Sequence, residues 1–250
     1  RENTNDGVGW WIRFSHYIQS AEYGYPCLYK NFIEDMIPAL GMYGGGSGTG
    51  ALYLQEPGWP QEYNNKPLMA DWGRSTIFIH DVKSDGPTFT DTPSEFLKVS
   101  QVADLDVDAS GRMYVAAWDG AGFSGNPNKG YVERYVPADW EFKAFPNLIK
   151  ASKAELLGFI NTASATSRVY AQQEILARKD QSYVNDLVRL AKSAKTSESR
   201  VAAVYTLAQL AQASAFPNLV ELSKVAELRE HAVRLMGDRK PFNQKADIKL

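Results

Sequence analysis

The sequence predicts a multidomain protein of the β-then-α class. We expect a partial β-propeller of about two to three blades, followed by an α-solenoid of helical repeats. Three observations lead to this prediction: strand-like segments alternate with tight turns in the first half, glycine and tryptophan almost vanish after residue 137, and an arginine-led helical pattern recurs in the second half. The predicted division is propeller blades over 1–137, a linker over 138–150 and the solenoid over 151–250.

The composition changes sharply at the predicted linker. Residues 1–137 hold 17 of the 19 glycines and five of the six tryptophans, with 10 Lys and Arg against 17 Asp and Glu. Residues 138–250 carry 17 Lys and Arg against 12 Asp and Glu. The net charge of −2 gives no sign of nucleic-acid binding. No run of roughly 18 apolar residues predicts a membrane span.

Residues 101–137 contain the clearest strand pattern. Acidic and aliphatic residues alternate over 104–108, which is the period of a half-buried strand, and a tight turn at Gly111 follows. The remaining elements are a strand over 113–118, a loop rich in Gly, Asn and Pro over 119–130, and a strand over 131–136. Three strands at this spacing predict most of one propeller blade.

A second blade is predicted over residues 47–99. Its strands are expected at 51–54, 67–72, 75–82 and 88–99, with a tight turn at Gly73 and Arg74. Two blades alone would expose apolar faces and strand edges. We therefore expect the missing blades upstream or on another chain.

From about Asn147 the apolar pattern becomes helical. Arg168, Arg200 and Arg229 are each followed by alanine three positions later and by an aliphatic residue at about the seventh position, which makes one apolar helix face. The arginines are 32 and 29 residues apart, a spacing that suits paired-helix repeats. Such repeats stack into an α-solenoid, whose curved face can bind a protein partner.

Four segments resemble a known family. The segments 22–26, 48–53, 71–74 and 104–118 are similar to the late blades of glucose/sorbosone dehydrogenase-type propellers. The chain resembles most closely large bacterial envelope proteins in which such a propeller runs into HEAT-like repeats, many of which end in a c-type haem domain. The resemblance implies a periplasmic or cell-envelope location, pyrroloquinoline quinone (PQQ), calcium and a redox partner. Cys27 is the sole cysteine, and without a Cys-x-x-Cys-His motif we expect no covalent haem in this chain.

The resemblance also implies which residues hold the cofactor. In the family, Arg, His, Trp and Asp side chains on loops bind the quinone and the substrate. Arg74 would pair with a quinone carboxylate and Trp72 would stack on the planar ring; Asp71, Trp118 and Asp119 complete the predicted wall. The alternative is structural: Trp72 packs between sheets, and Arg74 pairs with Asp71 or Asp119.

The glycine loop before residue 51 allows two interpretations. Residues 46–51 fit the loose pattern G-x-G-x-x-A, but a strand and Pro57 follow instead of the helix that a dinucleotide site needs. The loop is therefore a flexible entry into a blade, or it lines the propeller mouth as corresponding loops do in the family.

Histidines and oxygen ligands are the remaining candidates for chemistry. A base in this class of enzyme is a histidine, and His16 and His80 are catalytic candidates, whereas His231 lies on a predicted solenoid helix. Asn3, Asn5 and Asp6 are candidate calcium ligands. The alternating carboxylates of Asp104, Asp106 and Asp108 are expected to face solvent.

Two functions follow from these expectations. The first is a PQQ-dependent dehydrogenase that oxidises a sugar or an alcohol and passes electrons to a quinone or haem carrier. The rival is a non-catalytic scaffold that binds a carbohydrate or a protein. No Ser-His-Asp, Cys-His or zinc pattern points to other chemistry.

Overall fold

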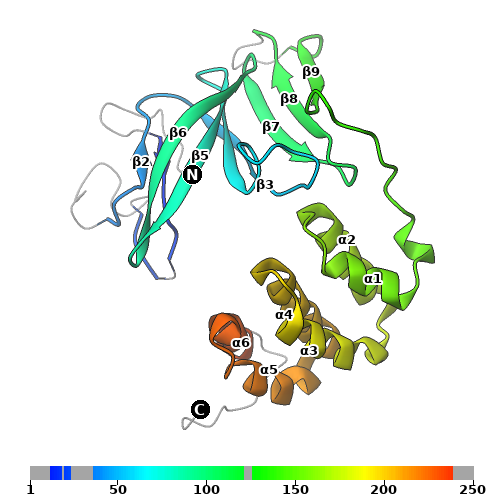
Figure 1. Ribbon diagram of the computed structural model, residues 1–250. Helices are drawn as coiled ribbons and strands as arrows, with labels where there is room; N and C mark the ends of the chain where they lie inside the picture. The colour runs from blue at the N-terminus through cyan, green and yellow to red at the C-terminus, as the bar shows by residue number, and fades with distance from the viewer. Residues whose placement is uncertain (1–11, 19, 24–35, 121–125, 239–250) are drawn as a thin grey trace. The chain divides into compact units, whose positions relative to one another are not determined.

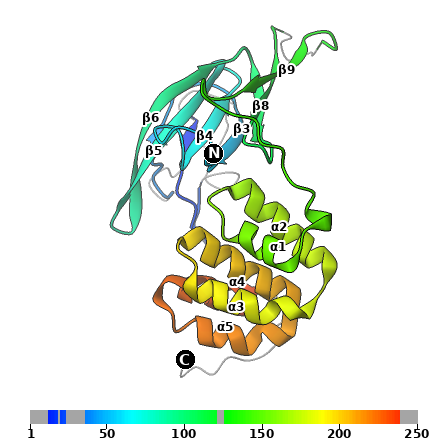
Figure 2. The same cartoon turned by 45° about the vertical axis from the view of Figure 1, so that its right-hand side comes forward.

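The computed structural model describes residues 12–18, 20–23, 36–120 and 126–238. The chain divides into two compact units, residues 1–141 and 142–250, which we call the β unit and the helical unit. Figures 1 and 2 show the two units in two views. No helix in the described ranges is both long and apolar enough to cross a membrane.

The described part of the β unit contains three antiparallel sheets. A two-stranded sheet pairs β1 (Arg13–Phe14) with β2 (Gly41–Met42). A four-stranded meander contains β3 (Gly48–Leu54), β4 (Lys66–Asp71), β5 (Thr76–Asp85) and β6 (Thr88–Lys98). A three-stranded meander contains β7 (Val102–Val107), β8 (Met113–Trp118) and β9 (Gly130–Tyr135).

An apolar core lies between the two meanders. Alternation along each strand directs every second side chain inward, so that Ile77 and Ile79 of β5 join Leu105 of β7 and Val115 of β8 in one buried cluster. Strand β3 lies beside β7 (Figure 1). The two backbones approach closely at Gly50, where a Cβ would lie 2.7 Å from the Cα of Asp104.

The helical unit contains six described α-helices, which contact each other in consecutive pairs (Figure 2). The pairs are α1 (Lys153–Ile160) with α2 (Ala165–Arg178), α3 (Val184–Ser193) with α4 (Ser197–Ala211), and α5 (Phe216–Leu222) with α6 (Arg229–Asp238). Side chains cap the N-termini of three of these helices. Ser152 forms a capping box with Glu155 at α1, Ser164 caps α2 and Thr196 caps α4.

The repeated arginines have a local structural role. Arg168 donates to the carbonyl oxygen of Thr162 at 2.7 Å. Arg200 and Arg229 donate in the same way to the carbonyls six residues earlier, those of Ala194 at 2.7 Å and Ser223 at 3.2 Å. Each arginine thus satisfies a backbone oxygen in the segment that precedes its own helix. The alanines three positions after each arginine are completely buried.

The predicted fold class, a partial β-propeller followed by an α-solenoid, is wrong. The described strands form three small separate sheets of two, four and three strands, without a propeller ring. The helices form three pairs around a single buried cluster that runs from Leu148 to Leu235, which is a small domain and not a long stacked array. The sequence signals on which the prediction depended, alternation and turn spacing, specify hairpins but not the packing between sheets. The arginine spacing marks a local contact that needs no long array.

Candidate functional site

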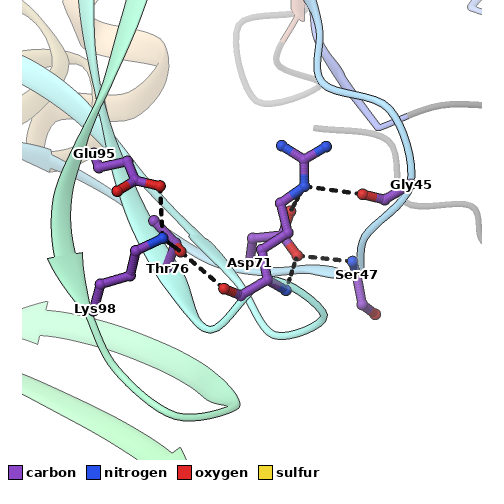
Figure 3. A network of polar contacts seen from close by, with 7 residues as sticks. Gly45, Ser47, Asp71, Thr76, Glu95 and Lys98 are labelled. Atoms are coloured by element: carbon purple, nitrogen blue, oxygen red, sulfur yellow. Dashed lines mark hydrogen bonds and ion pairs between the residues drawn. The ribbon is translucent and has the colours of Figure 1, made fainter.

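The turn between β4 and β5 contains the first three predicted cofactor residues. Asp71 ends β4, and its side chain is completely buried. Its Oδ1 accepts hydrogen bonds from the backbone N–H of Ser47 at 2.9 Å and of Arg74 at 3.2 Å (Figure 3). The carboxylate therefore closes the turn and fastens it to the loop before β3.

The guanidinium of Arg74 is bonded through Nε and partly exposed to solvent. Its Nε donates to the carbonyl oxygen of Gly45 at 2.9 Å and lies 3.8 Å from Oδ2 of Asp71. Its guanidinium carbon lies 6.0 Å from the centre of the Phe78 ring. About a third of the side chain, 34%, is exposed, and the two terminal nitrogens make no hydrogen bond with another described residue. Because the guanidinium is planar, fixing Nε also orients the terminal nitrogens, which form a fork suited to a carboxylate.

Neighbouring side chains hold the backbone of Arg74 in place. The hydroxyl of Thr76 donates to the carbonyl oxygen of Arg74 at 2.9 Å. Lys98 donates to that hydroxyl at 2.9 Å and to Glu95 at 2.6 Å (Figure 3). These contacts tie the turn to β6, so that the orientation of Arg74 is set by strands on both sides.

The glycine loop packs directly onto this turn. A Cβ at Gly44 would lie 3.2 Å from the Nη2 atom of Arg74, and Gly44 has a positive φ of 73°. At Gly46 a Cβ would lie 2.6 Å from the carboxylate of Asp71. Glycine is thus required because the loop backbone approaches Asp71 and Arg74 closely.

The other two predicted cofactor residues are Trp118 and Asp119, and Trp118 contacts the turn. Trp118, at the end of β8, meets Trp72 edge-to-face, with ring centres 6.0 Å apart and planes at 85°. Asp119 follows Trp118, and its Oδ2 lies 3.9 Å from the ammonium nitrogen of Lys129. The structure therefore joins Asp71, Trp72 and Arg74 in one turn and places Trp118 against it.

His80 lies in a different place, in a buried polar cluster. Its Nδ1 lies 2.8 Å from Oδ2 of Asp91, and the hydroxyl of Tyr43 donates to the same oxygen at 2.6 Å. Phe14 stacks on the imidazole with ring centres 4.2 Å apart. The side chains of His80 and Asp91 are completely buried, and Nε2 of His80 has no hydrogen-bond partner in the described part of the chain.

The chemistry of this cluster follows from Asp91. An ionised carboxylate only accepts hydrogen bonds, so Nδ1 of His80 is the donor where Oδ2 of Asp91 is ionised. Phe78, whose ring centre lies 6.0 Å from the guanidinium carbon of Arg74, is in ring contact with Tyr43, and Tyr43 is in ring contact with His80. The cluster of His80 therefore adjoins the turn of Arg74, although no described hydrogen bond joins the two side chains.

Sequence reasoning missed Tyr43 and Asp91 as partners of His80. They lie 37 residues before it and 11 residues after it. The alternation along β5 predicts only that His80 and Phe78 share a face; the partners depend on sheet register and on the loop that crosses it. The other weak candidate, His16, meets Phe89 edge-to-face at 4.9 Å, and His231 meets Tyr205 at 5.8 Å.

The predicted calcium ligands Asn3, Asn5 and Asp6 lie outside the described residues. Within the described ranges, no group of three or more His, Cys, Asp or Glu side chains is arranged to hold a metal ion. The alternating carboxylates accept local hydrogen bonds: Asp104 from the N–H of Leu105, Asp106 from that of Val107, and Asp108 from Ser110 and Arg112.

Comparison with family models, curated proteins and solved structures finds no match for the chain. The assignment of the site therefore depends on its side chains.

Proposed function

We propose that the chain is part of a quinone-dependent dehydrogenase that oxidises a sugar or an alcohol, and that its β unit helps to bind PQQ. One observation carries the proposal: Arg74 is fixed through Nε, while its terminal nitrogens make no hydrogen bond with any described residue. A bidentate contact with a carboxylate is the interaction that such a fork makes best. PQQ is planar and carries carboxylates, which matches an oriented guanidinium beside aromatic rings.

The residues of the turn fit this cofactor in part. Arg74 would hold a carboxylate, and Trp72, two residues earlier in the same turn, would supply the stacking ring; Trp72 itself meets Trp118 edge-to-face. Asp71 does not fit as a cofactor ligand, because its carboxylate is buried and occupied by backbone N–H groups. It acts indirectly by closing the turn that presents Arg74. When bound, the quinone would accept the electrons that an alcohol loses on oxidation to a carbonyl.

We assign no base and no calcium ligands. His80 is completely buried and its Nδ1 is engaged with Asp91, so its side chain is not exposed to a ligand at the turn.

The location and partners belong to the same proposal and are supported by the resemblance alone. We place the protein in the bacterial envelope, with a separate electron carrier or a c-type haem domain as its redox partner.

The test is an equilibrium titration of the full chain with PQQ, with and without calcium. Arg74→Ala should weaken binding by about ten- to a hundredfold, since a hydrogen bond to a charged group contributes roughly 1.5–3 kcal/mol. Arg74→Lys should recover only part of the loss, because lysine keeps the charge without the fork. Arg134→Ala, which removes an exposed arginine of β9, is the matched control. Equal affinity in Arg74→Ala, or no binding to the wild-type chain, would overturn the proposal.

One observation favours the rival function, a scaffold that binds a partner. The helical unit has a hollow of 630 Å³ along α1, lined by Pro146, Asn147, Lys150, Ala151, Glu155, Gly158, Phe159 and Thr162. Ile149, beside it in sequence, is 77% exposed. A scaffold would show partner binding without any affinity for the quinone, so the same titration separates the two functions.

A further inference from the structure

We propose that the helical unit associates with a second copy of this chain, and that Ile149 of each copy enters the hollow along α1 of the other. The inference goes beyond the proposed function and does not depend on it. It rests on the segment before α1 and on α1 itself, where an exposed apolar side chain, a hollow and charged side chains lie close together.

A short 3₁₀ helix over Leu148–Lys150 directs its three side chains to three different sides. Three residues make one turn of such a helix, so residues three apart lie on the same side. Leu148 is buried in the core of the helical unit, whereas Asn147 and Lys150 line the hollow. Ile149 takes the remaining side and is 77% exposed. An apolar side chain therefore projects into solvent beside a hollow that it does not line.

Hydrogen bonds hold the turn that carries Ile149. The backbone N–H of Ile149 donates to the side-chain oxygen of Asn147 at 3.1 Å. From α2, Arg178 donates to the carbonyl oxygens of Leu148 at 2.9 Å and of Ile149 at 3.2 Å. Arg178 is itself paired with Glu174 at 2.7 Å. Because the turn is already ordered, it would lose little conformational freedom on association.

The hollow suits an aliphatic side chain. Pro146, Ala151 and Phe159 give it apolar surface. The ring of Phe159 contacts that of Phe145 at 6.0 Å between centres, and Phe145 contacts Tyr170 at 5.7 Å. Tyr170 is 45% exposed, so aromatic surface continues beyond the hollow. The same contact that fills the hollow would cover part of this surface.

A second copy is the occupant that this arrangement fits. In a twofold dimer the same surface of both copies meets, so a projection beside a hollow can fill the hollow of the other copy in both directions at once. A partner without twofold symmetry would leave one of the two features unused.

The charges follow the same symmetry. Lys150 and Glu155 both line the hollow, and in the described part of the chain the ammonium of Lys150 makes no hydrogen bond or ion pair. Glu155 accepts a hydrogen bond from the backbone N–H of Ser152, which lowers the pKa of Glu155 and keeps it ionised. Since Lys150 follows Ile149 directly, it would reach the other copy's hollow together with Ile149 and meet Glu155 there.

The test is sedimentation equilibrium of the full chain over concentrations from about 1 to 500 µM. We expect a reversible dimer with a dissociation constant on the order of 10–100 µM, because the contact is small. Ile149→Asp should weaken association by about tenfold or more, since it would place a carboxylate against apolar residues. Val233→Asp, at an exposed apolar position of α6, is the matched control and should dimerise like the wild type.

The dependence on salt gives a second readout. Lys150→Glu would bring like charges together across the twofold axis, so added salt should strengthen the association of this variant and weaken that of the wild type. An effect of Lys150 on folding alone would not reverse the response to salt. A chain that stays monomeric over the whole concentration range overturns the inference, and so does a dissociation constant that Ile149→Asp leaves unchanged.

Discussion

Asp71 and Arg74 are adjacent in the turn, yet their accessibility differs greatly. The carboxylate of Asp71 is completely buried and bonded to the backbone, while 34% of the Arg74 side chain is exposed and its guanidinium is hydrogen-bonded to described residues through Nε. Within the motif 71–74, Asp71 therefore has a structural role, whereas the side chain of Arg74 is available to a ligand. The sequence does not distinguish these roles, because both residues are polar and both lie in the same predicted turn.

Gly50 is a residue whose replacement should disturb the packing of β3 against β7. A Cβ there would lie 2.4 Å from Oδ1 and 2.7 Å from Cα of Asp104, so Gly50→Ala forces β3 away from β7. We expect the free energy of unfolding to fall by roughly 1–3 kcal/mol, as in overpacked cores. Urea denaturation measures it, and Gly130→Ala is the control, since nothing lies within 4 Å of that position. Equal stability of the two variants would contradict the close approach.

Asp108 predicts a dependence of stability on pH. Burial opposes its ionisation, but hydrogen bonds from Ser110 and Arg112 more than offset this, so the pKa of Asp108 lies below the ordinary 3.8. A lowered pKa in the folded state stabilises the protein above the unfolded pKa, and this stabilisation is lost as pH falls through the folded value.

The measurement is the melting temperature of wild type and Asp108→Asn between pH 7 and pH 2.5. We expect the variant to be less stable by a constant amount above about pH 4 and the gap to close below it. Asp85→Asn, an exposed site at the β5–β6 turn, is the control for loss of one negative charge. A gap that stays constant down to pH 2.5 would show that the hydrogen bonds to Asp108 do not favour its ionised form.

At the scale of elements, patterns of local origin were predictable. Strands β7, β8 and β9 lie in the stretch where alternation and turn residues predict three strands. Helices α2, α4 and α6 contain or begin at the three arginines, and their spacing was visible because each arginine repeats the same contact with a carbonyl six residues earlier. Such signals depend on neighbours within a few residues, which a sequence displays directly.

Ala203 tests the apolar face of α4. Its side chain is completely buried in the single core of the helical unit. Ala203→Asp would place a carboxylate there without a partner, at a cost on the order of 3–5 kcal/mol. Thermal unfolding followed by circular dichroism at 222 nm measures the loss of helix. Ala154→Asp, at an exposed position in α1, is the matched control and should melt close to the wild type. A normal melting curve for Ala203→Asp would mean that this face is not the buried one.

At the scale of the whole molecule, long-range contacts decided what could not be predicted. The propeller and solenoid were wrong because sheet-to-sheet packing and the number of helix pairs depend on residues far apart in sequence. The cluster around His80 shows the same limit, since Tyr43 reaches Asp91 across 48 residues. For the candidate site, the local turn 71–74 was predictable from the sequence. Its contacts with Gly45 and Trp118 were not, because these residues come from other parts of the fold.

The central claim concerns the whole molecule: Arg74 serves a quinone that receives electrons from a substrate. The most direct measurement is turnover by the full chain reconstituted with PQQ and calcium, followed as reduction of an electron-accepting dye with a panel of sugars and alcohols. We predict reduction that requires both the quinone and a substrate and that falls with Arg74→Ala but not with Arg134→Ala. A chain that binds PQQ yet reduces no dye with any substrate would contradict the account.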